Sequence, residues 1–479
     1  MFEDPRTFRE ANRKEYGGLF YQMRWLDRPG ADEATVRRRE ILDRLEGRAD
    51  FLCEGSKPCY GELSPGCRHC SGGTWSCLFI NNRCNAACFF CPAPQEVDGM
   101  PSTSALTFAT PGEYADYCAE TGVRGISISG GEPLLSPDRT LAYLRECKKR
   151  FGDGCHFWLY TNGTLVDSDT FRRLADEGLD EIRFNIIARD YRTDMVGLAA
   201  KSIPVVTVEI PAVPEDSSLL RRAMHEMASA GAKHLNLHQI RCTPYNCRNL
   251  IERDYTFLHG PHASVLESEL AALDAMTFAA ENRLPLPVNY CSFIYRHRYQ
   301  GDAAARRAAI KTVTSTESVT ARGLIRRCSL GGDPERLAHA SAALGRDPQN
   351  AGQWSRSPQG GPITAVPELL AGITLDGLEL HIEYERAFFS DKDTGVAALV
   401  LDSGNKIFIS RSRRLAADLT DKEAGMFLDL CLGRNTTAGL AGNDALSGEY
   451  GGPWTDIAAC EKVPYGLQDY ESSSMDTGE

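Results

Sequence analysis

Short apolar runs alternate with helix-like stretches through the middle of the chain. Between residues 76 and 290 the apolar runs have the length and alternation of β-strands. The strand-like segments are 76–81, 125–129, 155–161, 181–187, 204–210 and 233–239, with a further candidate at 285–290. A strand followed by a helix, repeated along such a segment, is typical of parallel βαβ units. The pattern therefore predicts an α/β core whose parallel strands form either an open sheet or a barrel.

Polar side chains repeat on one face of several of these strands. Because successive strand side chains point to opposite faces, residues two apart share a face. The pairs are Ser127 with Ser129, Arg183 with Asn185, Thr207 with Glu209, and Asn236 with His238. The interior of a fully packed (β/α)8 barrel is filled by Val, Ile and Leu instead. We therefore expect a partial (β/α)6 TIM-like barrel with a polar ligand inside, the alternative being that these rows are solvated faces.

The segments on either side of this core have different patterns. Residues 33–46 show helical spacing and end at Gly47, which predicts a helix before a cysteine-rich stretch. Residues 345–363 are rich in Gly, Pro, Ser and Gln, and we interpret them as a linker or long loop. We expect an N-terminal helical and Cys-rich segment, the barrel core, a smaller α+β C-terminal module and a disordered tail, at residues 1–73, 74–300, 301–465 and 466–479.

The C-terminal module combines strand and helix signals. Segments 397–401 and 406–410 flank a short polar stretch with a glycine, which predicts a β-hairpin. Thr420 and Glu423 have the spacing of a capping box, so we expect a helix that begins there and ends near Gly433. The tail after residue 465 is polar and acidic, which is typical of disorder.

Composition narrows the class of protein. The chain has 479 residues and a formal charge of −12, which argues against nucleic acid as the main partner. The N-terminus lacks the pattern of a signal peptide, and no stretch has the ~20 apolar residues that span a membrane. We therefore expect a cytoplasmic protein. Seventeen cysteines in a reducing compartment indicate metal binding or redox chemistry rather than disulfides.

Three cysteines directly after the first strand give the strongest chemical signal. Cys84, Cys88 and Cys91 lie at spacings of four and three residues. Three thiolates on such a loop can bind three irons of a 4Fe-4S cluster, which leaves the fourth iron open to a ligand. A structural zinc site or buried thiols are the alternatives, although structural zinc normally takes four protein ligands.

The CxxxCxxC motif, with Phe90 before its last cysteine, resembles that of the radical S-adenosylmethionine (SAM) superfamily. Residues 130–133 (Gly-Gly-Glu-Pro) and 161–163 (Thr-Asn-Gly) are similar to further elements of that family. The resemblance covers about residues 74–295 and implies a 4Fe-4S cluster, SAM, a 5′-deoxyadenosyl radical and a flavodoxin- or ferredoxin-type reductant. It also implies cofactor contacts from the following residues: Phe90, Gly130, Gly131, Glu132, Asn162, Arg183 and Asn185.

A second group of cysteines lies upstream of that motif. Cys59, Cys67, Cys70 and Cys77 are a plausible four-ligand set for zinc, a single iron or an auxiliary iron–sulfur cluster. The alternative is that they are ordinary buried thiols. Cys291 and Cys328 are further candidates for a distant auxiliary site, the alternative being that they are structural.

Candidate catalytic residues lie at the carboxyl ends of the predicted strands, where the active sites of barrels are found. They are Tyr160, Glu209 and His238, any of which could act as a general acid or base or be a satisfied core residue. The stretch around residues 64–95 is similar to cobalamin-independent radical dehydratases of aminoglycoside antibiotic biosynthesis. That similarity implies a lyase that dehydrates a small polar substrate such as an aminosugar. A peptide- or protein-modifying radical enzyme and a non-catalytic, zinc-stabilised binding protein are the alternatives.

Overall fold

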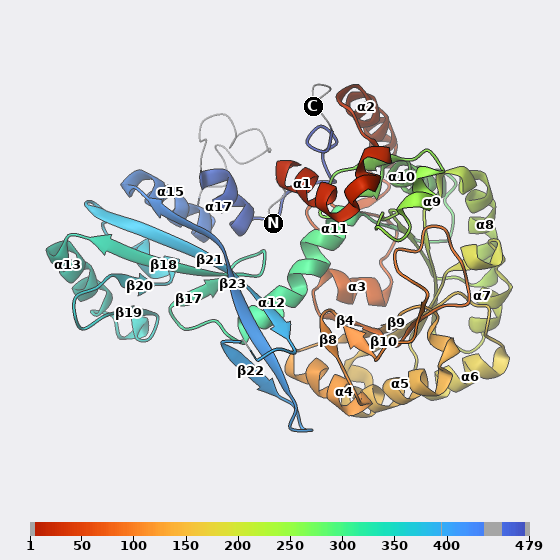
Figure 1. Ribbon diagram of the computed structural model, residues 1–479, viewed down its shortest axis with the longest axis horizontal. Coiled ribbons are helices and arrows are strands. Elements are labelled where there is room, and N and C mark those ends of the chain that lie inside the picture. Colours follow the sequence, from red (N-terminus) through yellow and green to blue (C-terminus); the bar gives the residue numbers. More distant parts are fainter. Residues whose placement is uncertain (1–4, 394, 435–452, 475–479) are drawn as a thin grey trace.

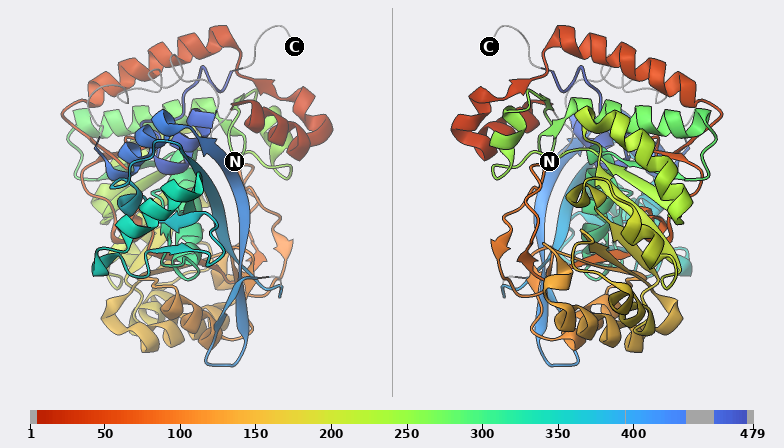
Figure 2. Two further views of the ribbon diagram at one scale, coloured as in Figure 1. Left: turned by 90° about the vertical axis from the view of Figure 1, so that its left-hand side faces the viewer. Right: turned by 90° about the vertical axis from the view of Figure 1, so that its right-hand side faces the viewer.

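The computed structural model describes residues 5–393, 395–434 and 453–474. A barrel-like α/β body and an antiparallel C-terminal sheet lie side by side, with α12 (Asp302–Ile310) between them (Figure 1). The N-terminal helices α1 (Pro5–Tyr16) and α2 (Arg28–Leu45) pack on the α/β body, and α2 lies along α10 (Leu266–Glu281) (Figure 2). The helix predicted before Gly47 is thus confirmed and begins earlier than its apolar pattern indicated.

Parallel strands form the centre of the α/β body, which confirms the predicted fold class. Each pairs in parallel with its neighbours in the order β4 (Trp75–Phe79), β9 (Gly125–Ser129), β10 (His156–Thr161), β11 (Glu181–Phe184), β12 (Val205–Pro211), β13 (His234–His238) and β16 (Val288–Cys291). The last of these was only a further candidate in the sequence. β3 (Lys57–Tyr60) then pairs antiparallel with β16, and β2 (Asp50–Leu52) with β3. The Cys-rich segment is therefore part of the same sheet.

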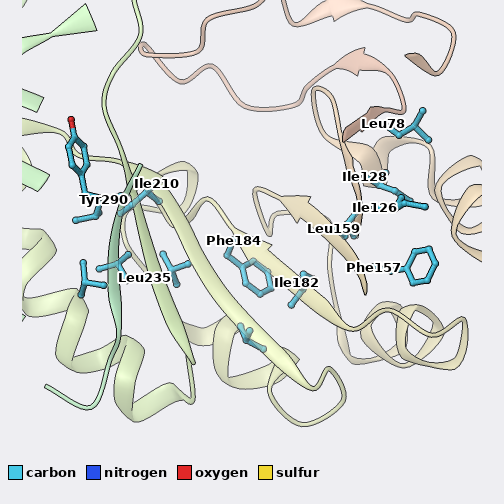
Figure 3. Packing of buried hydrophobic residues seen from close by; sticks show 14 of the residues in the cluster. Leu78, Ile126, Ile128, Phe157, Leu159, Ile182, Phe184, Ile210, Leu235 and Tyr290 are labelled. Carbon is cyan, nitrogen blue, oxygen red and sulfur yellow. The ribbon is translucent and has the colours of Figure 1, made fainter. Parts of the chain in front are cut away.

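Helices cover the outer face of these strands. They are α4 (Pro111–Glu120), α5 (Pro137–Phe151), α6 (Ser168–Asp176), α7 (Asp194–Ala199), α8 (Ser217–Ala230) and α10. Alternate strand residues such as Ile126, Phe157 and Ile182 are buried against them (Figure 3). Burying each such side chain contributes about 1.5–3 kcal/mol. Local signals fix the helix ends, since Asp167 caps α6 at Thr170 N and Gly231, with a φ of +94°, ends α8.

The other face of the strands points to the inside of the barrel and carries polar residues such as Arg183, Glu209 and Asn236, as their alternation predicted, together with aromatic ones such as Trp75 and Trp158. Helix α3 (Pro65–Ser71) closes the amino ends of the strands. Its Gly66 N donates to Glu181, the first residue of β11, at 3.0 Å. A Cβ on Gly66 would lie 2.2 Å from Arg183 Nη2, so glycine lets the helix approach the barrel interior closely. The polar interior is therefore closed at one end by the Cys-rich segment.

The C-terminal module is built on an antiparallel sheet. Its strands run in the order β19 (Trp354–Arg356), β20 (Ile363–Ala365), β18 (Leu324–Gly332), β21 (Leu378–Ser390), β23 (Lys406–Leu419) and β22 (Ala397–Val400), and β17 (Glu317–Val319) pairs with β18. The predicted hairpin is confirmed as β22 and β23. The capping box at Thr420 and Glu423 is confirmed at the start of α15 (Asp421–Leu432), which ends at Gly433 with a φ of +66°.

Two predictions for this half of the chain are wrong. The expected linker at residues 345–363 contains β19 and enters β20, because Ile363 is fully buried and Trp354 packs on the same core. The tail is not disordered where it is described, at residues 466–474. Tyr470 is fully buried and donates to Glu269 on α10. Residues 475–479 lie outside the described part of the chain.

Shorter elements connect these parts of the chain. The helices include η1 (Gly17–Gln22), α9 (Cys247–Ile251), α11 (Phe293–Tyr295), the π-helix η6 (Arg296–Gly301), α13 (Pro334–Leu344), α14 (Pro367–Leu370) and α17 (Pro453–Glu461). The strands include β5 (Asn82–Arg83), β6 (Glu96–Val97), β7 (Ser102–Thr103), β8 (Leu106–Thr107) and β14 (Thr256–Leu258). Among the described helices, none is long and apolar enough to cross a membrane.

Candidate active site

A cavity of about 630 Å³ lies inside the barrel. Residues of each parallel strand line it, together with the loop after β4 and residues of α3, η6 and α12. The polar face of the strands therefore meets an open space, which is what the sequence predicted from the alternation of side chains. Cys84, Cys88, Cys91 and Phe90 are all among the lining residues.

The three cysteines lie on a loop that the short strands β5 and β6 hold at its base. Cys84 N donates to Gln95 O at 3.0 Å, and Cys91 N to Cys88 O at 3.0 Å. Burial, together with the neighbouring Cys91 and Cys84 thiols, raises the pKa of Cys88 to about 11. Close thiols that raise one another's pKa favour a bound cation, which stabilises the thiolate forms. The loop thus presents three neighbouring thiols to the cavity, which is the donor type that a group held by three thiolates needs.

Residues 243–249, which were not predicted to contribute to the site, hold the cysteine loop through hydrogen bonds. Asn246 Nδ2 donates to Phe90 O at 2.9 Å, and Thr243 Oγ1 donates to Pro92 O at 2.9 Å. Asn249 Nδ2 adds a bond to Phe89 O at 3.4 Å. These residues follow β13 without any motif, so nothing in their spacing could have identified them.

The glycine pair after β9 lines the cavity and also lies against the cysteine loop. A Cβ on Gly131 would be 1.9 Å from Arg83 O, and one on Gly130 would be 2.1 Å from Asn81 O. Gly131 N donates to Asn81 O at 3.1 Å. The sequence indicated a close approach of backbone to a ligand, whereas the structure shows a close approach to the backbone on which Cys84 lies.

Glu132 connects the turn after β9 to the turn after β10. Its carboxylate is 1% exposed and accepts hydrogen bonds from Asn162 N at 2.7 Å, Thr161 Oγ1 at 2.9 Å and Leu134 N at 3.0 Å. Burial raises its pKa, and these donors act in the opposite direction. Glu132 does not line the cavity. Glu132 therefore ties the two loops together, and its expected contact with the cofactor stays a prediction.

Asn162 lies where the sequence placed it, beside the cysteine loop. Its Nδ2 lies 3.8 Å from Cys84 Sγ and donates to Asn85 Oδ1 at 2.8 Å. Asn185 also lines the cavity, and its side chain accepts from Ile187 N at 3.2 Å. Both are thus placed to contact a ligand bound next to the loop.

The part of the chain that carries these features matches a known family. Residues 78–197 fit the model of the radical SAM superfamily, a range that includes the three cysteines and the turns after β9 and β10. Residues 78–197 thus form a radical SAM superfamily domain within the chain. Members of the superfamily use a 4Fe-4S cluster and SAM, and the residues that fit the cluster here are Cys84, Cys88 and Cys91.

Curated relatives resemble only part of the chain. A putative glycyl-radical enzyme activating enzyme of Methanocaldococcus jannaschii is 28% identical over 284 residues, which are 56% of this chain and 73% of that protein. A probable GTP 3′,8-cyclase of Methanopyrus kandleri is 37% identical over 109 residues, 23% of this chain and 33% of that protein. The chain therefore spans about a third of the cyclases it matches. Among solved structures, methylornithine synthase has 13% identity and a TM-score of 0.32, with 58% of this chain and 77% of that chain covered.

Arg183 of this radical SAM domain is buried and already paired. Its Nε lies 2.8 Å from Glu181 Oε1, and its Nη1 lies 2.6 Å from Glu209 Oε2. Its Nη2 donates to Ser64 Oγ at 2.9 Å. Burial would raise the pKa of Glu181, but Arg183 and His156 outweigh it and lower that pKa to about 2. The Arg183 guanidinium therefore holds Glu209 in place, and its expected contact with the cofactor stays a prediction.

The predicted catalytic residues come together in the cavity. Glu209 Oε1 lies 2.6 Å from His238 Nε2, and Glu209 Oε2 accepts from Asn236 Nδ2 at 2.9 Å. Tyr160 OH accepts from Arg183 Nη1 at 3.4 Å. Burial, followed by the charge of Glu209, raises the pKa of Tyr160 well above its usual value. All three side chains line the cavity.

The upstream cysteines are not assembled into the predicted four-ligand site. Among the described residues, no group of three or more His, Cys, Asp or Glu side chains is arranged around a single metal position, and this is true of Cys84, Cys88 and Cys91 as well. Cys59 packs with Leu63 and Cys67 and does not line the cavity. Cys70 lies 3.3 Å from Tyr295 OH, and burial raises the pKa of Cys77 to about 12. A second metal site made by Cys59, Cys67, Cys70 and Cys77 therefore stays a prediction.

Four basic side chains that were not predicted as site residues also line the cavity. They are Lys57, Arg241, Arg296 and Arg307. Lys57 lies between Cys53 and Cys59 in sequence and is only 1% exposed. A lysine in a short strand next to cysteines carries no recognisable pattern, so only the pairing of β3 with β16 brings it to the cavity.

Proposed function

We propose that this radical SAM enzyme binds a 4Fe-4S cluster through Cys84, Cys88 and Cys91 and acts on a small polar substrate held in the barrel cavity. The observation that carries the proposal is that the three thiols and the Glu209–His238 pair line one cavity. When bound, the cluster supplies the electron that cleaves SAM, as in other members of the superfamily. The chain's own residues orient the substrate and handle its protons.

Glu209 and His238 are the residues that would move a proton. Their contact of 2.6 Å lets the carboxylate accept from the imidazole Nε2–H, which fixes the ring. A His whose ring is oriented by a carboxylate inside a cavity is suited to general acid–base catalysis. Arg183 supports the pair because its Nη1 lies 2.6 Å from Glu209 Oε2 and neutralises the charge of that carboxylate.

The charge of the cavity bears on the kind of substrate. Of the described residues that line it, five are Lys or Arg (Lys57, Arg183, Arg241, Arg296, Arg307) and one, Glu209, is a carboxylate. An aminosugar carries positive charge, and a cavity with surplus positive charge repels it. The aminosugar substrate expected from the sequence is therefore not part of the proposal. The dehydratase reaction is not part of it either, since the relatives reported above are described as an activating enzyme and a cyclase.

Substitution of the cluster cysteines tests the proposal. We expect alanine at Cys84, Cys88 or Cys91 to reduce iron content and the formation of 5′-deoxyadenosine to background, because each thiolate holds a different iron. The matched control is Cys155→Ala, which removes a buried thiol outside the cavity and should leave both quantities unchanged. Full SAM cleavage in any one of the three variants would contradict the cluster assignment.

A second candidate is the modification of a protein or peptide substrate, and one observation favours it. The relative that shares the longest matched segment given above is described as a putative activating enzyme for a glycyl-radical enzyme. The two candidates differ in how SAM cleavage responds to substrate. Stimulation of 5′-deoxyadenosine formation by metabolite-sized fractions of an extract favours the small-molecule candidate, and stimulation by the protein fraction alone favours the second.

A further inference from the structure

We propose that Lys57 and Arg296, with Gln300, form a binding site for an oxyanion of the substrate, a carboxylate or a phosphate. The proposal rests on the function proposed above and names the chemical class of its substrate. It starts from Lys57, whose side chain is 1% exposed and reaches the cavity from β3.

Lys57 is a buried cation without a buried anion. Its Nζ lies 4.0 Å from the centroid of the Tyr295 ring, and the ionisable groups that influence it most are the thiols of Cys291, Cys67 and Cys70. Among the described residues, none forms an ion pair with it. Isolated buried charges cost several kcal/mol, and lysines are seldom buried without a partner. The arrangement is therefore that of a site whose anion comes from outside the chain.

Arg296 and Gln300 converge on the same place from the π-helix η6. Arg296 Nε donates to Cys291 Sγ at 3.4 Å, and Gln300 Nε2 donates to Cys70 Sγ at 3.0 Å. Cys70, Cys291 and Tyr295 pack as one cluster, and Lys57 lies over its tyrosine ring. Three side chains with N–H donors thus surround one group of neutral, weakly polar side chains and face the cavity. Sulfur accepts hydrogen bonds weakly, so these donors retain capacity for an oxyanion.

The position of this site relates it to the acid–base pair. Arg296 Nη2 lies 3.5 Å from His238 Nε2, which in turn lies 2.6 Å from Glu209 Oε1. An oxyanion held by Lys57 and Arg296 would place the adjoining part of the substrate next to His238. The anion site would then serve to orient the substrate between the acid–base pair and the cysteine loop.

Calorimetry with two simple anions tests the site directly. Inorganic phosphate and acetate are titrated separately into the reconstituted holoenzyme, in the wild type, Lys57→Gln and Lys57→Arg. We expect Lys57→Gln to weaken binding at least about tenfold and Lys57→Arg to retain most of the affinity. The matched control is Lys201→Gln, a substitution at an exposed lysine, which should bind as the wild type does. Binding of phosphate alone or acetate alone identifies which oxyanion the site takes.

Equal affinity in the wild type and Lys57→Gln would overturn the inference, as would the absence of binding of both anions by the wild type. If Lys57→Gln does not fold, Arg296→Gln takes its place with the same expected loss. Failure of the proposed function is a separate result, because it would be seen as absence of iron and of 5′-deoxyadenosine in the wild type whatever the anion titrations give.

Discussion

Arg183 is the residue on which most of the polar interior depends. It joins Glu181, Glu209 and Ser64, which come from two strands and from the Cys-rich segment. Strand alternation placed Arg183 inside the barrel correctly, but it could not give its partners, since those depend on how α3 closes the barrel. For the same reason Lys57 was missed. At the scale of one residue, the sequence predicts which face a side chain occupies better than what it contacts.

The buried pairs of Arg183 give a stability prediction. Arg183→Met leaves two buried carboxylates without their cation, so we expect the free energy of unfolding to fall by about 3–5 kcal/mol. Urea unfolding of the wild type and the variant measures it. Arg183→Lys keeps the charge but loses the separate N–H donors that reach Glu181 and Glu209, and it should cost less. A loss below about 1 kcal/mol in the methionine variant would contradict the account of this network.

The turns after the strands show what can be predicted for whole elements. The strands themselves were found from alternation, and the residues 130–133 and 161–163 were placed after the correct strands. Their contacts differ from expectation, because Glu132 binds the second turn and Gly131 lies against Arg83 O. The segment 345–363 was misinterpreted since its polar composition hid a buried Ile363. A polar composition does not separate a loop from a short strand when one or two buried residues are enough to hold the strand in the sheet.

The close packing of Gly131 leads to a prediction for this element. Gly131→Ala places a Cβ against the backbone at Arg83 O, so the cysteine loop must shift. We expect iron content or the rate of SAM cleavage to fall at least about tenfold, which corresponds to a disturbance of about 1.4 kcal/mol or more. The control is Gly425→Ala within α15, where the added Cβ meets no atom within 4 Å. Wild-type cleavage by Gly131→Ala would show that the loop tolerates the shift.

At the scale of the molecule, segments distant in sequence hold the barrel together. Tyr470, near the C-terminal end of the described chain, is buried against Glu269, and the centroid of its ring lies 3.8 Å from Arg38 Cζ. His259 stacks on Trp25 with ring centroids 3.9 Å apart, and its Nδ1 lies 3.1 Å from Asn12 Oδ1 on α1. Such contacts explain why the polar tail is ordered at residues 466–474. The periodicity of hydrophobic residues within one helix or strand gives no information about contacts between segments so far apart in sequence.

His259 makes the stability of the whole molecule depend on pH. Burial, together with the charge of Arg9, lowers its pKa from 6.5 to about 3. Below about pH 6.5 the unfolded chain binds a proton that the folded chain takes up only near pH 3, so this contribution to stability is lost as the pH falls through that range. At pH 5 we expect a loss of about 2 kcal/mol relative to pH 8. Urea unfolding at the two pH values measures it. His259→Gln should remove this part of the difference, and an unchanged pH dependence in the variant would contradict the assignment.

The central claim is that the loop of Cys84, Cys88 and Cys91 holds a cluster that cleaves SAM inside this cavity. Anaerobic reconstitution, with iron and sulfide counts and 5′-deoxyadenosine measured after addition of dithionite and SAM, tests it most directly. The account predicts about four irons and four sulfides per chain with 5′-deoxyadenosine formed, and neither in Cys88→Ala. Zinc in place of iron, with no 5′-deoxyadenosine from the wild type, would contradict it.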